Sequence, residues 1–204
     1  PFKEISTKIE DFRAKRITAY LNLMDEIVKN RFEEFKASLH EKEEELEKYF
    51  ELLPDFSDIK RRFNSFIKNN TVREDIIKCV ETNLMPDDID VNIMTKVDKE
   101  NYESKEVKLP SKYNDAHAAL RGFANSSLES SLVLSAGMNP RLYSYIEEFK
   151  DFYPDKNGRL KKKITIKVSD YRSSLIQEKF LAKKGIWVSE YRIESGLNCG
   201  GHAF

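Results

Sequence analysis

The chain has 204 residues, 40% of them hydrophobic, and its 35 basic and 35 acidic residues cancel. This length suits one domain, or two small ones, with a buried core. Because the net charge is zero, no overall field would gather nucleic acid or an anionic membrane surface, and we expect neither as a partner.

The two cysteines, Cys79 and Cys199, are far apart and lack the paired spacing of a zinc site or a disulfide framework. No stretch approaches the roughly 20 apolar residues that a membrane span needs. The charged start of the chain also lacks the apolar segment of a signal peptide. These features predict a cytoplasmic protein.

Residues 1–84 have the composition of a helical region, since Ile5 to Leu84 contains no glycine and Pro54 as its single proline. A long helix is expected from about Thr18 to Leu53. One apolar stripe runs along it, with members at helical spacing that need a partner helix: Phe32, Phe35, Leu39, Leu46, Tyr49 and Leu53. The acidic residues opposite the stripe are expected to form a solvated face.

Two further helices are predicted before residue 84. Pro54 ends the long helix, and Ser57 or Asp58 can cap the next one. Thr71 and Glu74 have capping-box spacing for a helix that runs to about Val80. We therefore expect three or four helices in this region.

Residues 85–204 alternate short β-branched runs with helical stretches, which is typical of β/α units and a mainly parallel sheet. Strands are expected at residues 91–95, 131–135, 164–168 and 186–193, and helices at 116–124, 140–148 and 173–183. Gly185 is expected to close the last helix, and Trp187 to lie in the core. The predicted fold class is α/β, with a helical N-terminal half followed by consecutive β/α units.

In parallel β/α folds the ligand lies at the carboxyl ends of the strands, so the loops that follow the strands are where functional residues should gather. Here these loops are residues 136–140, 169–172 and 195–202. His40 and His117 lie in helical segments and are expected to be structural or solvated. His202 follows two glycines at a strand end, where its near-neutral pKa suits general acid or base chemistry.

The segment Gly196-x-x-x-Gly200-Gly201-His202 resembles the Gly-x-x-x-Gly-Gly-His turn of nitronate monooxygenases and the related flavin-dependent enoyl reductases, which are FMN-dependent TIM-barrel enzymes. Asp90-Val-Asn-Ile-Met94 is similar to a strand of that family. The apolar runs at 131–137 and 164–169 follow in the family's order. The chain is more distantly similar to the FMN barrel of glutamate synthases.

The resemblance implies an FMN-dependent oxidoreductase acting on a small substrate with an acidic carbon or an enoyl group. His202 would be the catalytic base, while the FMN-binding residues would be Gly137, Asn139, Ser169, Gly200 and Gly201. A complete barrel takes about 250 residues. The chain also lacks the family's opening flavin-contacting strand and its phosphate-binding glycine loops. We therefore expect part of a barrel, and weak FMN binding by this chain alone.

The alternative is a non-catalytic interaction module, in which the helical region, residues 1–84, pairs with a partner or with itself beside a β/α scaffold of residues 85–204. The stripe from Phe32 to Leu53 motivates it, because such a face needs something to pack against. A nucleotide-binding doubly wound sheet would need a Gly-x-Gly-x-x-Gly or Walker-type loop, and the sequence has neither.

Overall fold

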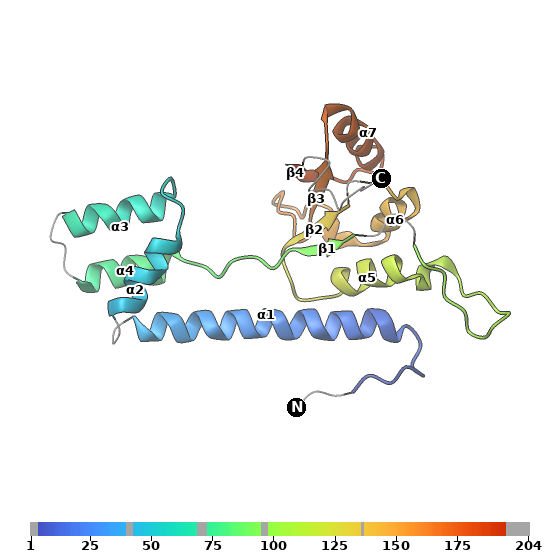
Figure 1. Cartoon of the computed structure of the whole chain (residues 1–204), viewed down its shortest axis with the longest axis horizontal. Coiled ribbons are helices and arrows are strands. Elements are labelled where there is room, and N and C mark those ends of the chain that lie inside the picture. Colours follow the sequence, from blue (N-terminus) through green and yellow to red (C-terminus); the bar gives the residue numbers. More distant parts are fainter. Residues whose placement is uncertain (1–3, 40–42, 69–72, 95–97, 136, 195–204) are drawn as a thin grey trace, which may run out of the picture. The chain divides into compact units, whose positions relative to one another are not determined.

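The computed structural model describes residues 4–39, 43–68, 73–94, 98–135 and 137–194. Contacts divide the chain into two compact units. One is residues 26–87, and the other combines residues 1–25 with residues 88–204. Figure 1 labels the helices and strands of both units, which are described separately below.

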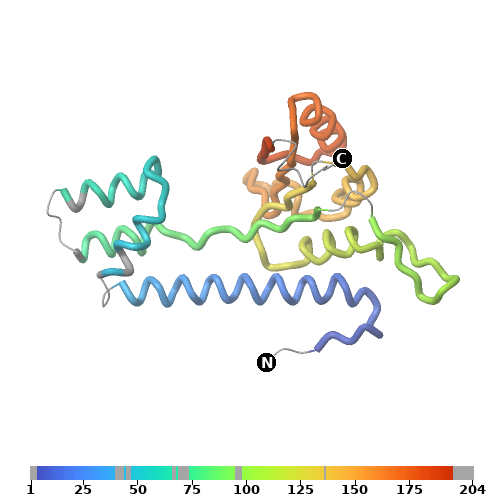
Figure 2. The backbone as a smooth tube through the Cα atoms, viewed as in Figure 1, coloured from blue at the N-terminus to red at the C-terminus, as the bar shows by residue number. Residues whose placement is uncertain are grey.

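The unit of residues 26–87 is helical, as predicted. It contains the second half of α1 (Phe12–Ser38) together with α2 (Glu43–Leu52), α3 (Asp58–Lys68) and α4 (Arg73–Asn83). Figure 2 shows α3 and α4 as antiparallel neighbours. The unit has its own buried core, made of Leu39, Phe50, Phe63, Ile76, Ile77, Val80 and Leu84.

The prediction of a single helix from Thr18 to Leu53 was wrong, because the chain forms two helices, α1 and α2, over this range. The rings of Phe35 and Tyr49 lie 5.0 Å apart. In one straight helix their positions would be separated by about 21 Å. The apolar stripe therefore packs against itself, with Phe32, Phe35, Tyr49 and Leu53 lying against the core of this unit.

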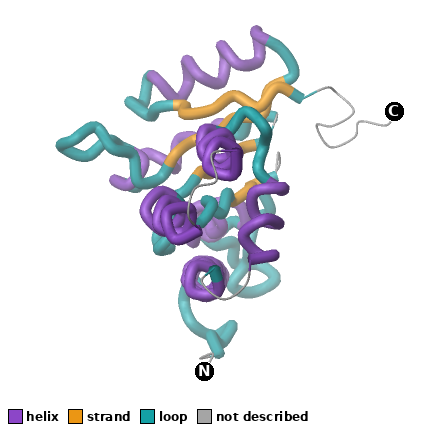
Figure 3. The backbone as a smooth tube through the Cα atoms, turned by 90° about the vertical axis from the view of Figure 1, so that its left-hand side faces the viewer, coloured by secondary structure: helices purple, strands orange, loops and turns teal. Residues whose placement is uncertain are grey.

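The second unit contains a parallel sheet of β1 (Val91–Ile93), β2 (Ser131–Leu134), β3 (Lys163–Val168) and β4 (Val188–Ile193). The strands stand side by side in chain order, β1-β2-β3-β4. They are joined through α5 (Asp115–Ala124), α6 (Pro140–Tyr145) and α7 (Tyr171–Ala182), as Figure 3 shows with strands in orange and helices in purple. The predicted alternation of strands and helices is confirmed.

One face of this sheet is apolar and packs against all three connecting helices. Parallel strands in chain order with right-handed crossovers place every crossover helix on the same face. The buried cluster on that face joins strand residues to helix residues: Ile93, Leu132, Leu134, Ile164, Ile166 and Val168 from the strands, and Leu120, Phe123, Leu142, Tyr143 and Leu181 from the helices. The core of the unit lies between these two layers.

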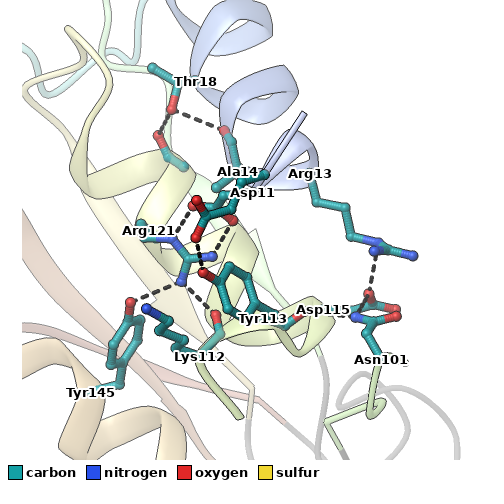
Figure 4. A network of polar contacts seen from close by, with 12 residues as sticks. Asp11, Arg13, Ala14, Thr18, Asn101, Lys112, Tyr113, Asp115, Arg121 and Tyr145 are labelled. Atoms are coloured by element: carbon teal, nitrogen blue, oxygen red, sulfur yellow. Dashed lines mark hydrogen bonds and ion pairs between the residues drawn. The ribbon is translucent and has the colours of Figure 1, made fainter. Parts of the chain in front are cut away.

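The first half of α1 also packs on this unit, alongside α5. Leu21 is buried in the core of the unit and Ile17 lies against it. The approach is close at Gly122 of α5, where a Cβ would lie 2.6 Å from the Ile17 Cγ2 atom. The Thr18 hydroxyl donates to the Gly122 carbonyl at 3.0 Å (Figure 4). Because only glycine fits here, the two helices can touch along their backbones.

The remaining connections contain short elements of their own. The segment of residues 102–113 contains an antiparallel bridge between Tyr102 and Lys108 and a 3-10 helix at Ser111–Tyr113. Two more 3-10 turns follow α6, at Ile146–Glu148 and Lys150–Phe152.

The end of α7 and the start of β4 test two predictions. Gly185 has a φ of 71° and its N–H donates to the Ala182 carbonyl, so the predicted closure of α7 is confirmed. The prediction that Trp187 lies in the core was wrong. This residue precedes β4 and is 67% exposed. Because β4 lies at the edge of the sheet, few neighbours cover Trp187.

Candidate functional site

The loops that follow β2 and β3 meet at one edge of the sheet, because the two strands are parallel neighbours. Ser135, Gly137 and Asn139 come after β2, and Ser169 comes after β3. The structure thus brings Gly137, Asn139 and Ser169 to the same edge, as predicted for strand-end loops.

The Asn139 side chain caps the helix that follows it. It is 7% exposed, and its Oδ1 atom accepts from the Leu142 N–H at 3.1 Å. Its Nδ2 group forms no hydrogen bond within the described part of the chain. The oxygen therefore fixes the start of α6 and the NH2 group remains available to a ligand.

Beside Asn139, the Ser135 hydroxyl donates to the Gly137 carbonyl at 3.1 Å and closes the first turn of the loop. Gly137 is half-buried. These contacts hold the glycine backbone at the strand edge, where a flat ligand could approach it.

The Ser169 hydroxyl is exposed and donates to Asp170 Oδ2 at 2.8 Å. Asp170 caps α7, because its Oδ1 accepts from the Ser173 N–H at 2.8 Å. The Ser173 N–H, followed by the Ser169 hydroxyl, lowers the pKa of Asp170 below its ordinary value. Ser169 therefore already supports a helix cap and keeps its oxygen lone pairs for a ligand.

Gly200, Gly201 and His202 lie outside the described residues. Glu194, the last residue described before them, donates its N–H to the Val168 carbonyl at 2.9 Å. Val168 is the final residue of β3, so Glu194 lies at the edge that holds the β2 and β3 loops.

The face of the sheet opposite the helices is polar, which the sequence reasoning missed. Most residues of this face are polar and alternate along the strands with the apolar ones: Asp90, Asn92, Ser131, Ser135, Lys163, Thr165, Lys167, Glu190 and Arg192. The exception is Val133, which lies between Ser131 and Ser135 and is buried. Lys167 pairs with Glu194 at 2.9 Å. The signal was present in the sequence as the alternation of Thr165 and Lys167 in β3 and of Glu190 and Arg192 in β4.

Arg192 bridges the two outer strands across this polar face. Its Nη2 atom donates to Asp90 Oδ2 at 2.7 Å, and its Nε atom donates to Glu190 Oε1 at 2.6 Å. In a flat sheet, strands three positions apart are separated by about 14 Å, farther than an Arg and an Asp side chain reach together. The Arg192–Asp90 bond therefore shows that the sheet is twisted or curved toward its polar face.

The described residues also bear on metal binding and membrane insertion. They contain no group of three or more His, Cys, Asp or Glu side chains placed to hold a metal ion. None of their helices is both long enough and apolar enough to cross a membrane.

Comparison with known proteins gives no relative from which a function could be transferred. No protein-family model, curated protein or solved structure matches the chain. Function must therefore be inferred from the geometry of the strand edge and from the sequence of the segment that follows β4.

Proposed function

We propose that residues 88–204 form a portion of an FMN-dependent oxidoreductase barrel that acts on a small substrate with an acidic carbon or an enoyl group. The main support is the sheet, whose strands stand in chain order and which is twisted or curved toward a polar face, with its helices on the other face. The Gly-Gly-His segment follows the fourth strand, and barrel enzymes hold their chemistry at such strand ends.

The strand edge suits the ring and ribityl parts of FMN. Those parts present carbonyl, nitrogen and hydroxyl groups, and the edge offers the Asn139 NH2 group, the Ser169 hydroxyl and the backbone at Gly137. Lys167 and Arg192 are paired with carboxylates, so in this proposal they support the polar face and do not bind the phosphate.

When bound, FMN would accept two electrons from a substrate with an acidic carbon, or, after reduction by an electron donor, would supply two electrons to an enoyl group. In the proposal, His202 removes a proton from the acidic carbon of the substrate, and Gly200 and Gly201 let the backbone come close to the flavin. Asn139 Nδ2 would donate to an acceptor on the flavin, while its Oδ1 atom keeps the loop in place through the α6 cap.

The direct test is to purify the intact gene product and titrate it with FMN, following the flavin absorption band and the quenching of flavin fluorescence. Saturable binding is expected. An intact protein that retains no flavin and perturbs neither signal would overturn the proposal.

A matched pair of variants sharpens this test. Asn139→Asp keeps the capping oxygen but removes the NH2 donor, so it should weaken FMN binding about tenfold or more without unfolding α6. Asn157→Asp, in the exposed turn at residues 154–158, makes the same chemical change far from the strand edge and should leave binding unchanged. His202→Ala should retain flavin and lose turnover.

The alternative proposal, an interaction module, is favoured by a different observation in the unit of residues 26–87. Leu52, Phe56 and Met85 are 86%, 80% and 77% exposed, although the stripe itself packs inside that unit. Large exposed apolar side chains favour association. Light scattering should detect a dimer that the Leu52→Asp, Phe56→Asp double variant dissociates; a monomer at all concentrations removes this alternative.

A further inference from the structure

A buried pair, Asp98 and His117, lies at the start of α5. Their side chains are 7% and 5% exposed, and the His117 Nδ1 atom is in hydrogen-bond contact with Asp98 Oδ2. The other carboxylate oxygen of Asp98 accepts from the Ala116 N–H at 2.6 Å. The Tyr145 ring lies 4.9 Å from the imidazole, centroid to centroid. The histidine is therefore fixed by a carboxylate that is itself held by the first turn of a helix.

This arrangement determines which nitrogen of His117 is available. A carboxylate at Nδ1 selects the neutral tautomer with the proton on Nδ1, which leaves a lone pair on Nε2. Among the residues that the structure describes, none forms a hydrogen bond with Nε2. His117 thus offers an oriented acceptor, which needs a donor on a ligand.

His117 lines an open hollow of about 670 Å³, which we call the His117 hollow. It lies against the segment before α5, the first turns of α6, and α7, and it is lined by Ser111, Lys112, His117, Pro140, Arg141, Ser144, Tyr145, Glu148 and Phe180. Because the hollow is open to solvent, a small molecule bound in it would stay partly exposed.

The other polar groups of the hollow are mainly hydrogen-bond donors. Arg141 forms no hydrogen bond or ion pair within the described residues, although, after Lys108, it is one of the charges that lower the pKa of the Glu100 carboxyl. The hydroxyls of Ser111 and Ser144 form no hydrogen bond within the described residues either. Lys112 adds a second positive charge, while Glu148 provides one negative charge. Two cations and two hydroxyls suit a carboxylate, whereas His117 Nε2 and Glu148 suit a neighbouring donor group.

We propose that the His117 hollow binds a small carboxylate that has a hydroxyl or ammonium group on the adjacent carbon. The carboxylate lies against Arg141 and Lys112, and the hydroxyl or ammonium group donates to Nε2 of His117. This site uses none of the residues assigned to flavin, so it stands or falls independently of the proposed function.

The test is NMR on the full chain with ¹⁵N-labelled histidine, at a pH where the His117 ring is neutral. The free protein should show the Nδ1–H tautomer, and its Nε2 resonance should move saturably on addition of glycolate or glycine. Glycolate tests the hydroxyl form of the ligand and glycine the ammonium form. Acetate, which lacks the donor, and methyl glycolate, which lacks the charge, should bind at least tenfold more weakly.

Arg141→Gln keeps the fold, because Arg141 is exposed, and should weaken binding about tenfold or more. Arg172→Gln, an exposed arginine on α7 outside the hollow, is the matched control and should change nothing. The proposal is overturned if the free ring is the Nε2–H tautomer. It is equally overturned if neither glycolate nor glycine gives a saturable shift, or if acetate and methyl glycolate bind as well.

Discussion

The guanidinium of Arg121 on α5 forms a bidentate ion pair with the carboxylate of Asp11, 110 positions earlier in the chain (Figure 4). Arg121 Nε donates to Asp11 Oδ2 at 2.6 Å, while Nη1 donates to the Tyr145 hydroxyl at 2.8 Å and to the Lys112 carbonyl at 2.5 Å. The Asp11 and Tyr145 bonds raise the pKa of Arg121 against the opposing effect of burial, so it stays charged. One arginine thus joins the start of α1 to α5 and α6.

Asp11→Asn should therefore destabilise the unit of residues 1–25 and 88–204. Asp11 has a φ of 57°, which asparagine also tolerates, so the backbone is preserved and only the charge is lost. Because both side chains are mostly buried, we expect a loss of about 2–4 kcal/mol in the free energy of unfolding. Urea denaturation followed by circular dichroism measures it.

The control is Arg13→Gln, which breaks the exposed pair between Arg13 and Asp115 at 3.3 Å. Exposed ion pairs contribute less than about 1 kcal/mol, so this variant should change stability little. If the two variants lost the same free energy of unfolding, the buried Asp11–Arg121 pair would contribute no more to stability than the exposed Arg13–Asp115 pair.

Gly122→Ala should destabilise the protein, although alanine normally favours a helix by about 1 kcal/mol over glycine. The new Cβ would lie 2.6 Å from the Ile17 Cγ2 atom and 3.0 Å from the Ala14 carbonyl oxygen. Overpacking of this kind costs about 1–3 kcal/mol. A double-mutant cycle with Ile17→Ala checks the cause: the alanine at 122 should cost less when Ile17 is absent, and an additive result would contradict the close packing.

The burial of Lys162 predicts how the free energy of unfolding should depend on pH. It is fully buried, and its Nζ atom donates to the Ser126 carbonyl at 3.0 Å, to the Ser126 hydroxyl at 3.2 Å and to the Leu128 carbonyl. Burial lowers the pKa of Lys162 to about 8. In the unfolded chain the pKa of a lysine is about 10.4. Between about pH 8 and about 10.4, the unfolded state therefore carries a proton on Lys162 that the folded state has lost. The free energy of unfolding should therefore rise with pH from about 8 to about 10 through this group.

Lys162→Met should remove that rise. It should also lower the stability at neutral pH by about 1–3 kcal/mol, because the carbonyls of Ser126 and Leu128 lose their donor. Lys161→Met is the control, since Lys161 is half exposed and pairs with Asp151 at 2.9 Å. Denaturation curves across this pH range give both values; a rise that persists in Lys162→Met would assign it to another group.

Tyr143→Phe should cost about 1–3 kcal/mol, because it leaves a buried acceptor without a donor. The Tyr143 hydroxyl donates to Gln177 Oε1 at 2.5 Å, and the two residues are 1% and 2% exposed. Burial raises the pKa of Tyr143, so the hydroxyl stays protonated. Adding Gln177→Leu to Tyr143→Phe should recover part of the loss in thermal unfolding. Tyr153→Phe, which removes a half-buried bond to the Lys184 carbonyl, should cost less.

The sequence alone determined the order and type of the elements, because local periodicity reports them directly. The β-branched runs around Val91, Leu132, Ile166 and Val188 became parallel strands, and Gly185 closed α7. The edge position of Gly137, Asn139 and Ser169 followed from that order, since parallel strands end on one side.

The tertiary structure decided what depends on residues far apart in the chain. Local periodicity could not separate one long helix from α1 and α2, because the contact of Phe35 with Tyr49 satisfies the same stripe. It could not show that Asp90 and Arg192, which are 102 positions apart, meet across the sheet. Such contacts form only when distant segments pack, and a single sequence records no such distances.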